Sequence, residues 1–301
     1  MVRQLRIAAE KLPPTWGERL QPAYRLLRTF ELRKARRQFE SSEGLPAFLP
    51  EEELETLACN YLPPPDYGYD PTAVGSRGNK RAAQILALPG MSESKSFLEL
   101  GCWDGMVCAA LQQTGKVTTG VDARSTGFDQ RARDAGVHLG CMDAEALEFP
   151  PDNFDVAFSY NAFEHFRHPD RVLTEMLRVV KPGGLIWLEF GPLYLSPYGE
   201  HVYRNIPVPY CSLLWPEDVL NNYTSRHGLP AIDYSHVNRW RLEQFRALLR
   251  SVPMEPIRYY EGLNLDHLNL ISRYSSCFKA KTEHFEDLLV QTIRALFRIA
   301  S

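Results

Sequence analysis

The stretch SFLELGCWDG, residues 96 to 105, decides the fold of this chain. A short apolar segment runs into a turn in which Gly101 and Gly105 stand four positions apart. A dinucleotide site needs a middle glycine as well, so that the backbone can approach a pyrophosphate. Here Trp103 lies in the middle of the turn, and no Gly-Lys-[Ser/Thr] run follows. The turn therefore disfavours a pyrophosphate ligand and excludes a phosphate-binding loop.

The charges around the turn point to a cationic ligand. Glu99 lies just before the first glycine, and Asp104 lies just before the second. Two carboxylates would repel phosphate, but they suit a ligand that carries an ammonium and a sulfonium. The sequence therefore predicts that the turn binds S-adenosylmethionine.

Working outward from the turn, apolar strands alternate with helical segments. The predicted strands cover residues 97–100, 117–121, 137–140, 154–160 and 185–190. Between the last two, residues 171–180 place apolar side chains on one helical stripe, and the run Lys-Pro-Gly-Gly ends that helix. Such alternation predicts a parallel sheet with helices on its faces.

The rest of the chain divides around this core. Residues 1–76 are interpreted as a helical N-terminal extension, broken by proline clusters, and residues 77–301 as the main domain. Residues 190–238 form a long insert rich in aromatic side chains and proline, and such loops tend to be functional. A helix over 239–251 and a strand over 256–260 follow. The tail from about residue 288 is interpreted as a final strand, with a helix as the alternative.

Four ordered motifs make the chain resemble the class I S-adenosylmethionine-dependent methyltransferases, and in particular their small-molecule and sugar O-methyltransferases. These motifs are FLELGCWDG (97–105), GVDARS (120–125), CMDAEALEFPPDNFDVAFS (141–159) and EMLRVVKPGGLIWLEF (175–190). The resemblance spans about residues 77 to 300. It implies an α/β, Rossmann-like fold with a seven-stranded, mostly parallel sheet and helices on both faces. The broken helices of the N-terminal extension cannot bury a core of their own, so we predict that the extension acts as a lid.

The resemblance also implies how the cofactor is bound. Glu99 would reach the methionine ammonium, Asp122 both ribose hydroxyls, and Asp143 the adenine amino group. Asp122 stands 21 positions after Gly101, a spacing at which doubly wound folds place a ribose acid. Trp103 departs from the family pattern. The residues predicted to bind the cofactor are Glu99, Gly101, Cys102, Trp103, Gly105, Asp122, Ala123, Asp143, Ala144 and Tyr160.

Methyl transfer to a hydroxyl needs an aligned acceptor and is helped by a general base. The resemblance nominates His165, which follows the fourth strand, with Glu189 orienting it or the acceptor. His201 in the insert is the second candidate base. These residues, with Glu164 and His168, could instead ligate a metal, but the paired acids typical of divalent-metal methyltransferases are missing. We therefore predict no metal.

The acceptor wall is predicted from tyrosines on loops stiffened by proline. Tyr67, Tyr69, Tyr194 and Tyr198 offer flat amphipathic faces that suit a sugar ring or an aromatic compound. We therefore predict a small-molecule or glycan acceptor, as in the biosynthesis of a natural product or a glycan.

Charge is spread unevenly over the 301 residues. The net charge is -3, yet residues 1–40 hold ten Lys or Arg against four Glu. Residues 22–39 have the pattern of a basic amphipathic helix. It could be a solvated helix packed by one stripe, a lid, a membrane-surface contact or a nucleic-acid contact, and the sequence leaves these alternatives open.

Two other functions compete with O-methylation. A nucleic-acid methyltransferase, such as one acting on RNA, is motivated by the basic N-terminal segment, but residues 160–163 lack the prolines that follow the fourth strand in amino-methylating enzymes, and the chain is acidic overall. A non-catalytic binding module is disfavoured because Glu99, Asp122 and Asp143 are all present.

The setting of the protein is predicted from what the sequence lacks. The six cysteines are scattered, no leader is evident, and no apolar run approaches the ~20 residues of a membrane span. A cytoplasmic protein is the simplest expectation, and homodimer formation is left open.

Overall fold

The computed structural model describes residues 28–64 and 68–300, which form two compact units. The sheet unit comprises residues 65–194, 235–262 and 292–301. Among the described residues, the helical unit comprises residues 28–64, Leu195–Tyr234 and Leu263–Gln291. The predicted insert contributes mainly to the helical unit. The boundary expected between residues 76 and 77 falls inside one continuous helix, Pro71–Leu86, so that the sheet unit begins earlier in the chain.

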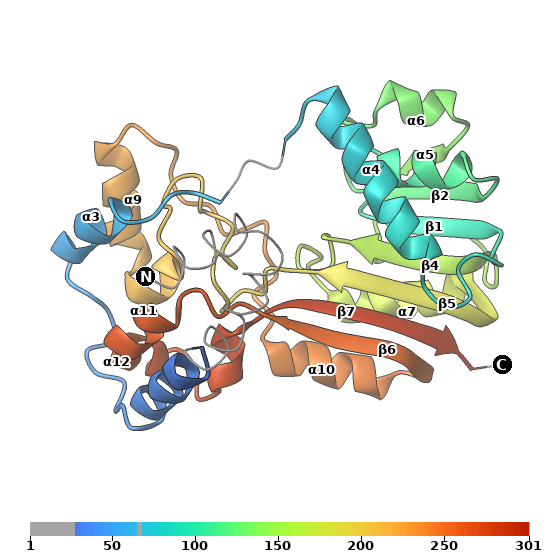
Figure 1. The fold of residues 1–301 in the computed structure, drawn as a ribbon. Coiled ribbons are helices and arrows are strands. Elements are labelled where there is room, and N and C mark those ends of the chain that lie inside the picture. Colours follow the sequence, from blue (N-terminus) through green and yellow to red (C-terminus); the bar gives the residue numbers. More distant parts are fainter. Residues whose placement is uncertain (1–27, 65–67, 301) are drawn as a thin grey trace, which may run out of the picture. The chain divides into compact units, whose positions relative to one another are not determined.

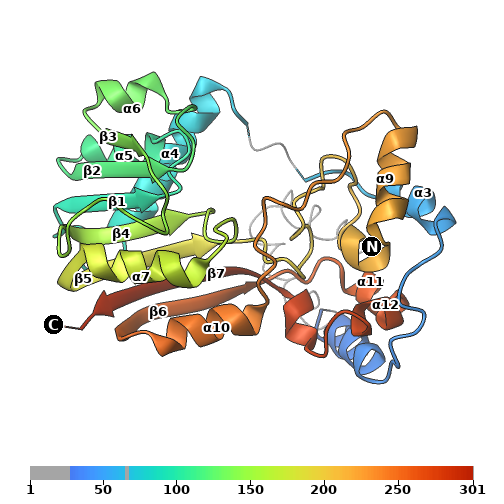
Figure 2. The same cartoon turned by 180° about the vertical axis from the view of Figure 1, so that it is seen from behind.

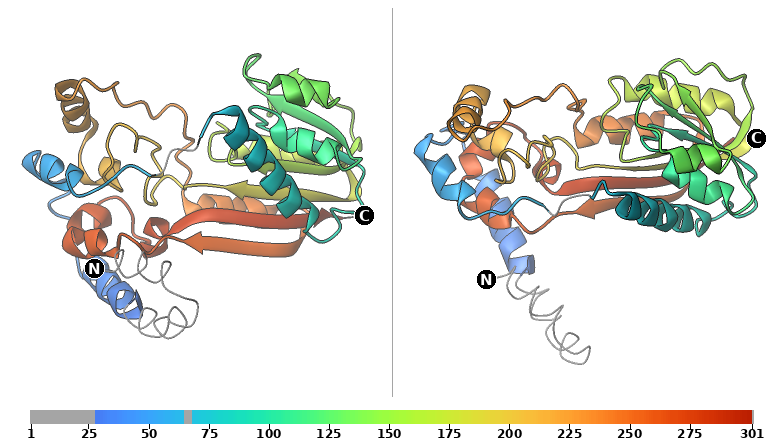
Figure 3. Two further views of the ribbon diagram at one scale, coloured as in Figure 1. Left: turned by 45° about the horizontal axis from the view of Figure 1, so that its top comes forward. Right: turned by 90° about the horizontal axis from the view of Figure 1, so that it is seen from above.

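The sheet unit contains the predicted seven-stranded, mostly parallel sheet, in the order β3-β2-β1-β4-β5-β7-β6 (Figure 1). Its strands are β1 Ser96–Leu100, β2 Val117–Asp122, β3 His138–Cys141, β4 Phe154–Tyr160, β5 Val180–Phe190, β6 Met254–Leu263 and β7 Val290–Ile299. Strands β1 to β5 pair in parallel, and β7 runs antiparallel to β5. Strands β6 and β7 lie side by side at one edge (Figure 3). The tail is thus a strand.

Helices cover both faces of this sheet, as predicted. Figure 1 shows α4, α5 and α6 on one face, and Figure 2 shows α7 and α10 on the other. The helices are α4 Pro71–Leu86, α5 Met106–Gln112, α6 Gln130–Asp134, α7 Pro169–Val179 and α10 Leu242–Ser251. Helix α7 buries Val172, Leu173 and Met176 completely, which is the stripe expected from the sequence.

The run Lys181-Pro182-Gly183-Gly184 behaves differently from the expected turn. Pairing of β4 with β5 begins at Phe154 and Val180, and resumes at Val156 and Leu185, so these four residues bulge out of one long strand. Gly183 has a φ of +74°. A Cβ on Gly184 would lie 2.8 Å from the Asp155 carbonyl oxygen, so both glycines are needed for the bulge.

The helical unit consists of short helices built from three separate stretches of the chain. They are the helix over 28–40, α3 Glu52–Ala58, α8 Cys211–Leu214, α9 Glu217–Arg226, α11 Leu268–Arg273, α12 Ser275–Lys279 and the 3₁₀ helix η1 Phe285–Leu288. Long-range contacts hold the stretches together: Tyr210 Oη donates to the Leu288 carbonyl at 2.8 Å, and Trp215 Nε1 donates to the Pro50 carbonyl at 3.0 Å. Among the described residues, no helix is both long enough and apolar enough to cross a membrane.

The strand order fixes where a ligand would bind in the sheet unit. The chain winds outward from β1 through β2 to β3, and from β4 through β5 in the other direction. Neighbouring strands β1 and β4 therefore form the switch point of the sheet. In open α/β sheets, ligands bind beyond the carboxyl ends of the strands at such a point. The glycine turn after β1 and the Glu164-His165 pair after β4 both follow these ends.

Candidate active site

The glycine turn after β1 is held by backbone contacts to β2. The amides of Gly101 and Cys102 donate to the Val121 carbonyl at 2.8 and 3.0 Å. Gly101 and Gly105 have φ values of +73° and +76°, which favour glycine. A Cβ on Gly101 would lie 2.4 Å from the Cβ of Ala162, so this position has no room for a side chain. The turn thus lies directly against the segment that follows β4.

Trp103 has an unusual environment for the middle of such a turn. Its φ is +48° and its side chain is 52% exposed. The guanidinium of Arg124 stacks 3.6 Å from the centre of the indole ring. Trp103 is therefore held at the surface of the site by a cation–π contact.

Asp122, the predicted ribose acid, is already fully engaged by hydrogen bonds. Its Oδ2 accepts from the Trp103 amide at 2.9 Å. Its Oδ1 accepts from the Arg124 amide at 3.1 Å and from Arg124 Nε at 2.9 Å, while Arg124 Nη2 lies 3.3 Å from Oδ2. Since a carboxylate offers about four acceptor positions, ribose hydroxyls can bind here only if the Arg124 side chain turns away.

Glu99 is the deepest acid of the turn. It is 2% exposed, and its Oε2 accepts from the thiol of Cys108 on α5 at 3.2 Å. Burial raises the pKa of Glu99 to about 8, and the Cys108 hydrogen bond and the charge of Arg81 oppose this shift. A cation close to Glu99 would favour the ionised carboxylate, as expected for a group that meets an ammonium.

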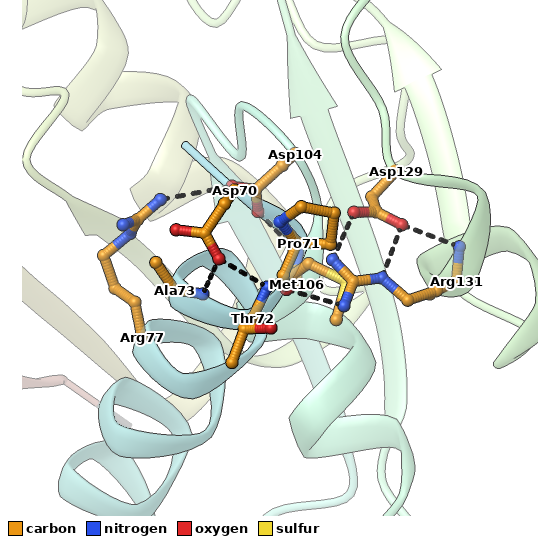
Figure 4. A network of polar contacts seen from close by, with 9 residues as sticks. All are labelled: Asp70, Pro71, Thr72, Ala73, Arg77, Asp104, Met106, Asp129 and Arg131. Carbon is orange, nitrogen blue, oxygen red and sulfur yellow. Dashed lines mark hydrogen bonds and ion pairs between the residues drawn. The ribbon is translucent and has the colours of Figure 1, made fainter. Parts of the chain in front are cut away.

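Helix α4 brings two arginines to the turn, and sequence reasoning did not single them out. Arg77 Nη2 lies 3.8 Å from Asp104 Oδ2, and Asp104 Oδ1 accepts from the Met106 amide at 2.9 Å (Figure 4). Arg81 stacks 4.0 Å from the centre of the Tyr160 ring. Gly78 could have indicated this contact from the sequence, because a glycine within a helix can mark close packing. In the structure, a Cβ at Gly78 would lie 2.6 Å from the Met106 carbonyl oxygen.

Figure 4 also shows a second acid and arginine pair, at the start of α6. Asp129 Oδ1 accepts from the Arg131 amide and from Arg131 Nε, both at 2.9 Å. The arginine lies two positions after the aspartate, as Arg124 does after Asp122. Here the arginine also donates to the Pro71 carbonyl at 2.8 Å. The Asp129 pair is thus structural, and it offers a matched control for the Asp122 pair.

The remaining predicted cofactor residues lie at the ends of β1, β2, β3 and β4. The Ala123 carbonyl accepts from the Cys141 thiol at 3.4 Å, and Asp143 Oδ1 accepts from the Glu145 amide at 2.9 Å beside buried Ala144. Cys102 is buried. Tyr160 Oη donates to Gln84 Oε1 at 3.1 Å, and burial raises the pKa of Tyr160 to about 12.

His165 is held by the backbone of a distant segment of the sheet unit. Its Nδ1 lies 2.5 Å from the His236 carbonyl oxygen. The backbone around it is fixed by Asn238, whose Nδ2 donates to the carbonyls of Phe163 and Phe166 at 3.1 and 3.0 Å. Burial lowers the pKa of His165 below its ordinary value, although its side chain is 35% exposed. The sequence gave no signal for the His236 contact, which joins residues 71 positions apart.

The carboxylate beside His165 is Glu164 rather than Glu189. Glu164 Oε1 lies 3.9 Å from His165 Nε2 and accepts from the Gly191 amide at 3.1 Å. Glu164 is 4% exposed, and burial raises its pKa to about 8. Its Oε2 is buried without a hydrogen bond among the described residues. Glu189 instead pairs with Arg294 Nε at 3.1 Å across β5 and β7.

The other predicted acceptor residues are divided between the units. Tyr69 and Tyr194 belong to the sheet unit, where Tyr69 is 53% exposed and Arg239 lies 5.8 Å from the Tyr194 ring. His201 and Tyr198 belong to the helical unit, and the Tyr198 ring packs against His267 at 5.6 Å. Tyr67 lies outside the described residues.

Comparisons with known proteins agree with this fold. Residues 98–188 match a family model described as a methyltransferase domain. The chain is 25% identical over 174 residues to a ubiquinone biosynthesis O-methyltransferase of Coxiella burnetii, which covers 53% of this chain and 74% of the relative. It is 27% identical over 190 residues to the enzyme of that name from Brucella ovis, with 56% and 77% covered.

Solved structures resemble the chain more distantly. A protein from Pyrococcus horikoshii has a TM-score of 0.47 at 16% identity, covering 74% of this chain and 91% of that protein. An S-adenosylmethionine-dependent methyltransferase from Methanosarcina mazei has a TM-score of 0.45 at 16% identity, with 69% and 93% covered. The matched domain model and the seven-stranded sheet confirm the predicted resemblance to the class I methyltransferases that use S-adenosylmethionine.

Proposed function

We propose that the protein transfers a methyl group from S-adenosylmethionine to a hydroxyl of a small molecule or of a sugar or glycan unit, with His165 as the general base. The observation that carries the proposal is the contact between His165 Nδ1 and the His236 carbonyl. A carbonyl can only accept a hydrogen bond, so Nδ1 must carry the proton and Nε2 must be the basic nitrogen.

The pKa of His165 supports the same role. Because burial lowers it, the ring is neutral at neutral pH and ready to take a proton from an acceptor hydroxyl. Glu164 at 3.9 Å is close enough to stabilise the imidazolium that forms when the proton is taken. Since burial also favours the protonated form of Glu164, its carboxylate would become ionised most readily when His165 is charged. Glu189 remains a candidate for orienting the acceptor, and His201 remains the second candidate base.

The residues around the glycine turn fit the cofactor, which supplies a methyl group on a cationic sulfur. Glu99 would face the ammonium, Asp122 the ribose, and Asp143 the adenine, with Ala123 and Ala144 beside the ring. Arg81 is a cation near the turn and would hold the carboxylate of the methionine part, since its charge already favours ionisation of Glu99. The fit requires Arg124 to release Asp122, as its hydrogen bonds indicate.

The relatives support a small-molecule hydroxyl acceptor. Two of them carry the name ubiquinone biosynthesis O-methyltransferase, and the chain covers about three quarters of each. Tyr69, Tyr194 and Tyr198 would contact a flat acceptor, and residues 1–76 would act as a lid. A cytoplasmic setting, a metal-independent reaction and a role in natural-product or glycan biosynthesis stay predictions, and a homodimer stays an open alternative.

The proposal is tested by methyl transfer from tritium-labelled cofactor into defined acceptor classes. We expect label in a phenol, catechol or sugar hydroxyl, released by chemistry that cleaves methyl ethers. Label in RNA, or in amines alone, would contradict the O-methyl assignment. Cofactor binding without transfer to any acceptor in cell extracts would favour a non-catalytic binding module.

A further inference from the structure

The helix over residues 28–40 has two faces of different character (Figure 3, blue). Its inner face carries Arg28, Ala35 and Phe39, which are 8%, 0% and 1% exposed. Phe39 packs against Phe285 at 5.5 Å, and Arg28 forms an ion pair with Asp266. This face therefore anchors the helix in the helical unit.

The outer face combines an aromatic side chain with three cations. Phe30, Arg33, Lys34 and Arg37 follow the i, i+3, i+4, i+7 spacing of one helical face, and all four are exposed. Phe30 is 66% exposed, an unusual position for a large apolar side chain. Among the described residues, no ion pair is formed by Arg33, Lys34 or Arg37. A merely solvated helix face has no need of an exposed phenylalanine.

We propose that this outer face binds an anionic membrane surface, with Phe30 entering the headgroup layer and the three cations meeting lipid phosphates or carboxylates. Amphipathic helices lie on bilayers in this manner, with an aromatic residue at the interface and Lys and Arg around it. The cations flank Phe30 on both sides of the face, so that all four side chains can meet one plane.

The charge of the rest of the chain favours a bilayer over a nucleic acid. Beyond residue 40 the chain has 24 basic and 33 acidic residues, so a long polyanion would be repelled as it left the helix. A planar bilayer needs to touch only the helix face. This inference does not rest on the proposed function, because it concerns residues outside the cofactor turn and the His165 contact.

Co-sedimentation of the full chain with vesicles tests this inference. One set of vesicles contains phosphatidylcholine alone, and the other contains phosphatidylserine as well. We expect binding only to the anionic vesicles, weakened by salt. The triple variant Arg33→Gln, Lys34→Gln, Arg37→Gln should bind up to about a hundredfold less tightly, and Phe30→Ser should bind severalfold less tightly.

A matched variant removes the same charge elsewhere. Lys80→Gln, Lys95→Gln and Arg258→Gln change exposed cations in the sheet unit. This variant should bind anionic vesicles like the unchanged protein, and thermal unfolding checks that each variant is folded. Equal losses in both triple variants would overturn the proposal, since bulk charge would then explain binding. Absence of vesicle binding, or binding to RNA in preference to vesicles, would overturn it as well.

Discussion

Two carboxylates at the carboxyl-terminal edge of the same sheet have opposite environments. Asp122, the last residue of β2, accepts hydrogen bonds at both oxygens from Trp103 and Arg124. Glu164, after β4, is buried, and its Oε2 has no hydrogen bond among the described residues. The first acid is surrounded by hydrogen-bond donors, whereas burial favours the protonated form of the second. The carboxylate proposed for the cofactor is thus already paired with donors, and the one beside the proposed base is buried and poorly paired.

The largest expected effect tests the acceptor side. His165→Ala should lower kcat by roughly 10²- to 10⁴-fold with cofactor affinity nearly unchanged, because a base acts on the transition state. Steady-state kinetics and calorimetry together measure this. In the unchanged protein, kcat should rise with pH to a plateau, with a midpoint below the ordinary histidine pKa because burial lowers it.

Two control variants separate the base from its surroundings. His236→Ala should retain most of the activity, because the partner of His165 is the His236 carbonyl and not its side chain. His168→Ala changes a nearby histidine at the start of α7. If His165→Ala stayed active while His201→Ala did not, the base would belong to the helical unit. If neither mattered, the acceptor would be an amine or a carbon.

The second prediction concerns the fixed charge of Asp122. Asp122→Asn keeps an acceptor for the Trp103 amide but cannot accept from two ribose hydroxyls as a carboxylate does. Affinity for S-adenosylmethionine should fall at least tenfold by calorimetry, since charge-assisted hydrogen bonds contribute ~1.5 to 3 kcal/mol each. Asp129→Asn, in the pair at the start of α6, should leave affinity unchanged. Equal losses in both variants would mean that local folding, not ribose recognition, is being measured.

The third prediction uses the buried acids. The pKa of Glu164 is raised from 4.5 to about 8, so its folded state favours the protonated form. Its contribution to stability is therefore full below about pH 4.5 and is lost as pH rises to about 8. Glu164→Gln mimics the protonated acid and should remove up to a tenfold change in the unfolding constant per pH unit over that range.

Thermal unfolding of the unchanged protein and of Glu164→Gln across this pH range measures the difference. Glu99 has the same raised pKa, so part of the pH dependence should persist in Glu164→Gln and become smaller when Glu99→Gln is added. A pH profile of unfolding that is identical in the unchanged protein and in Glu164→Gln would show that Glu164 is ionised in the folded state, and the contrast with Asp122 would be lost.

Local pattern was enough to predict the sheet unit. Each strand and α7 show a clear periodicity of apolar residues in the sequence. The glycines of the first turn indicate positive φ values, which other residues rarely adopt. The bulge at residues 181–184 was missed, because Lys-Pro-Gly-Gly is an equally good signal for a helix end and for a kink within a strand. The helical unit was missed as well, since three distant stretches form it and no period in any one of them reports the others.

The same distinction applies to the site. The glycines and Asp122 could be nominated from the sequence because their predicted roles depend on short spacing along the chain. The environment of Glu164 depends on its burial, and the His165 contact joins residues 71 positions apart. Short spacing along the sequence predicts neither. Arg124 was within reach of the sequence, two residues after Asp122, but only the structure shows that its side chain occupies the oxygens that ribose needs.

The smallest expected effect comes from that arginine, and it has the opposite sign to the others. Removing the side chain in Arg124→Ala frees Asp122 for ribose without breaking the Trp103 amide contact, so affinity for S-adenosylmethionine should rise, by about two- to tenfold. Trp103 is half exposed and stacked on the same guanidinium, so its fluorescence should change when the cofactor binds to the unchanged protein, and this change should shrink in Arg124→Ala. Arg131→Ala removes the matched arginine beside Asp129 and should alter neither signal. A loss of affinity in Arg124→Ala would mean that the guanidinium contacts the bound cofactor itself. Asp122 and Arg124 would then bind the cofactor together, and Arg124 would not have to leave Asp122 before ribose binds.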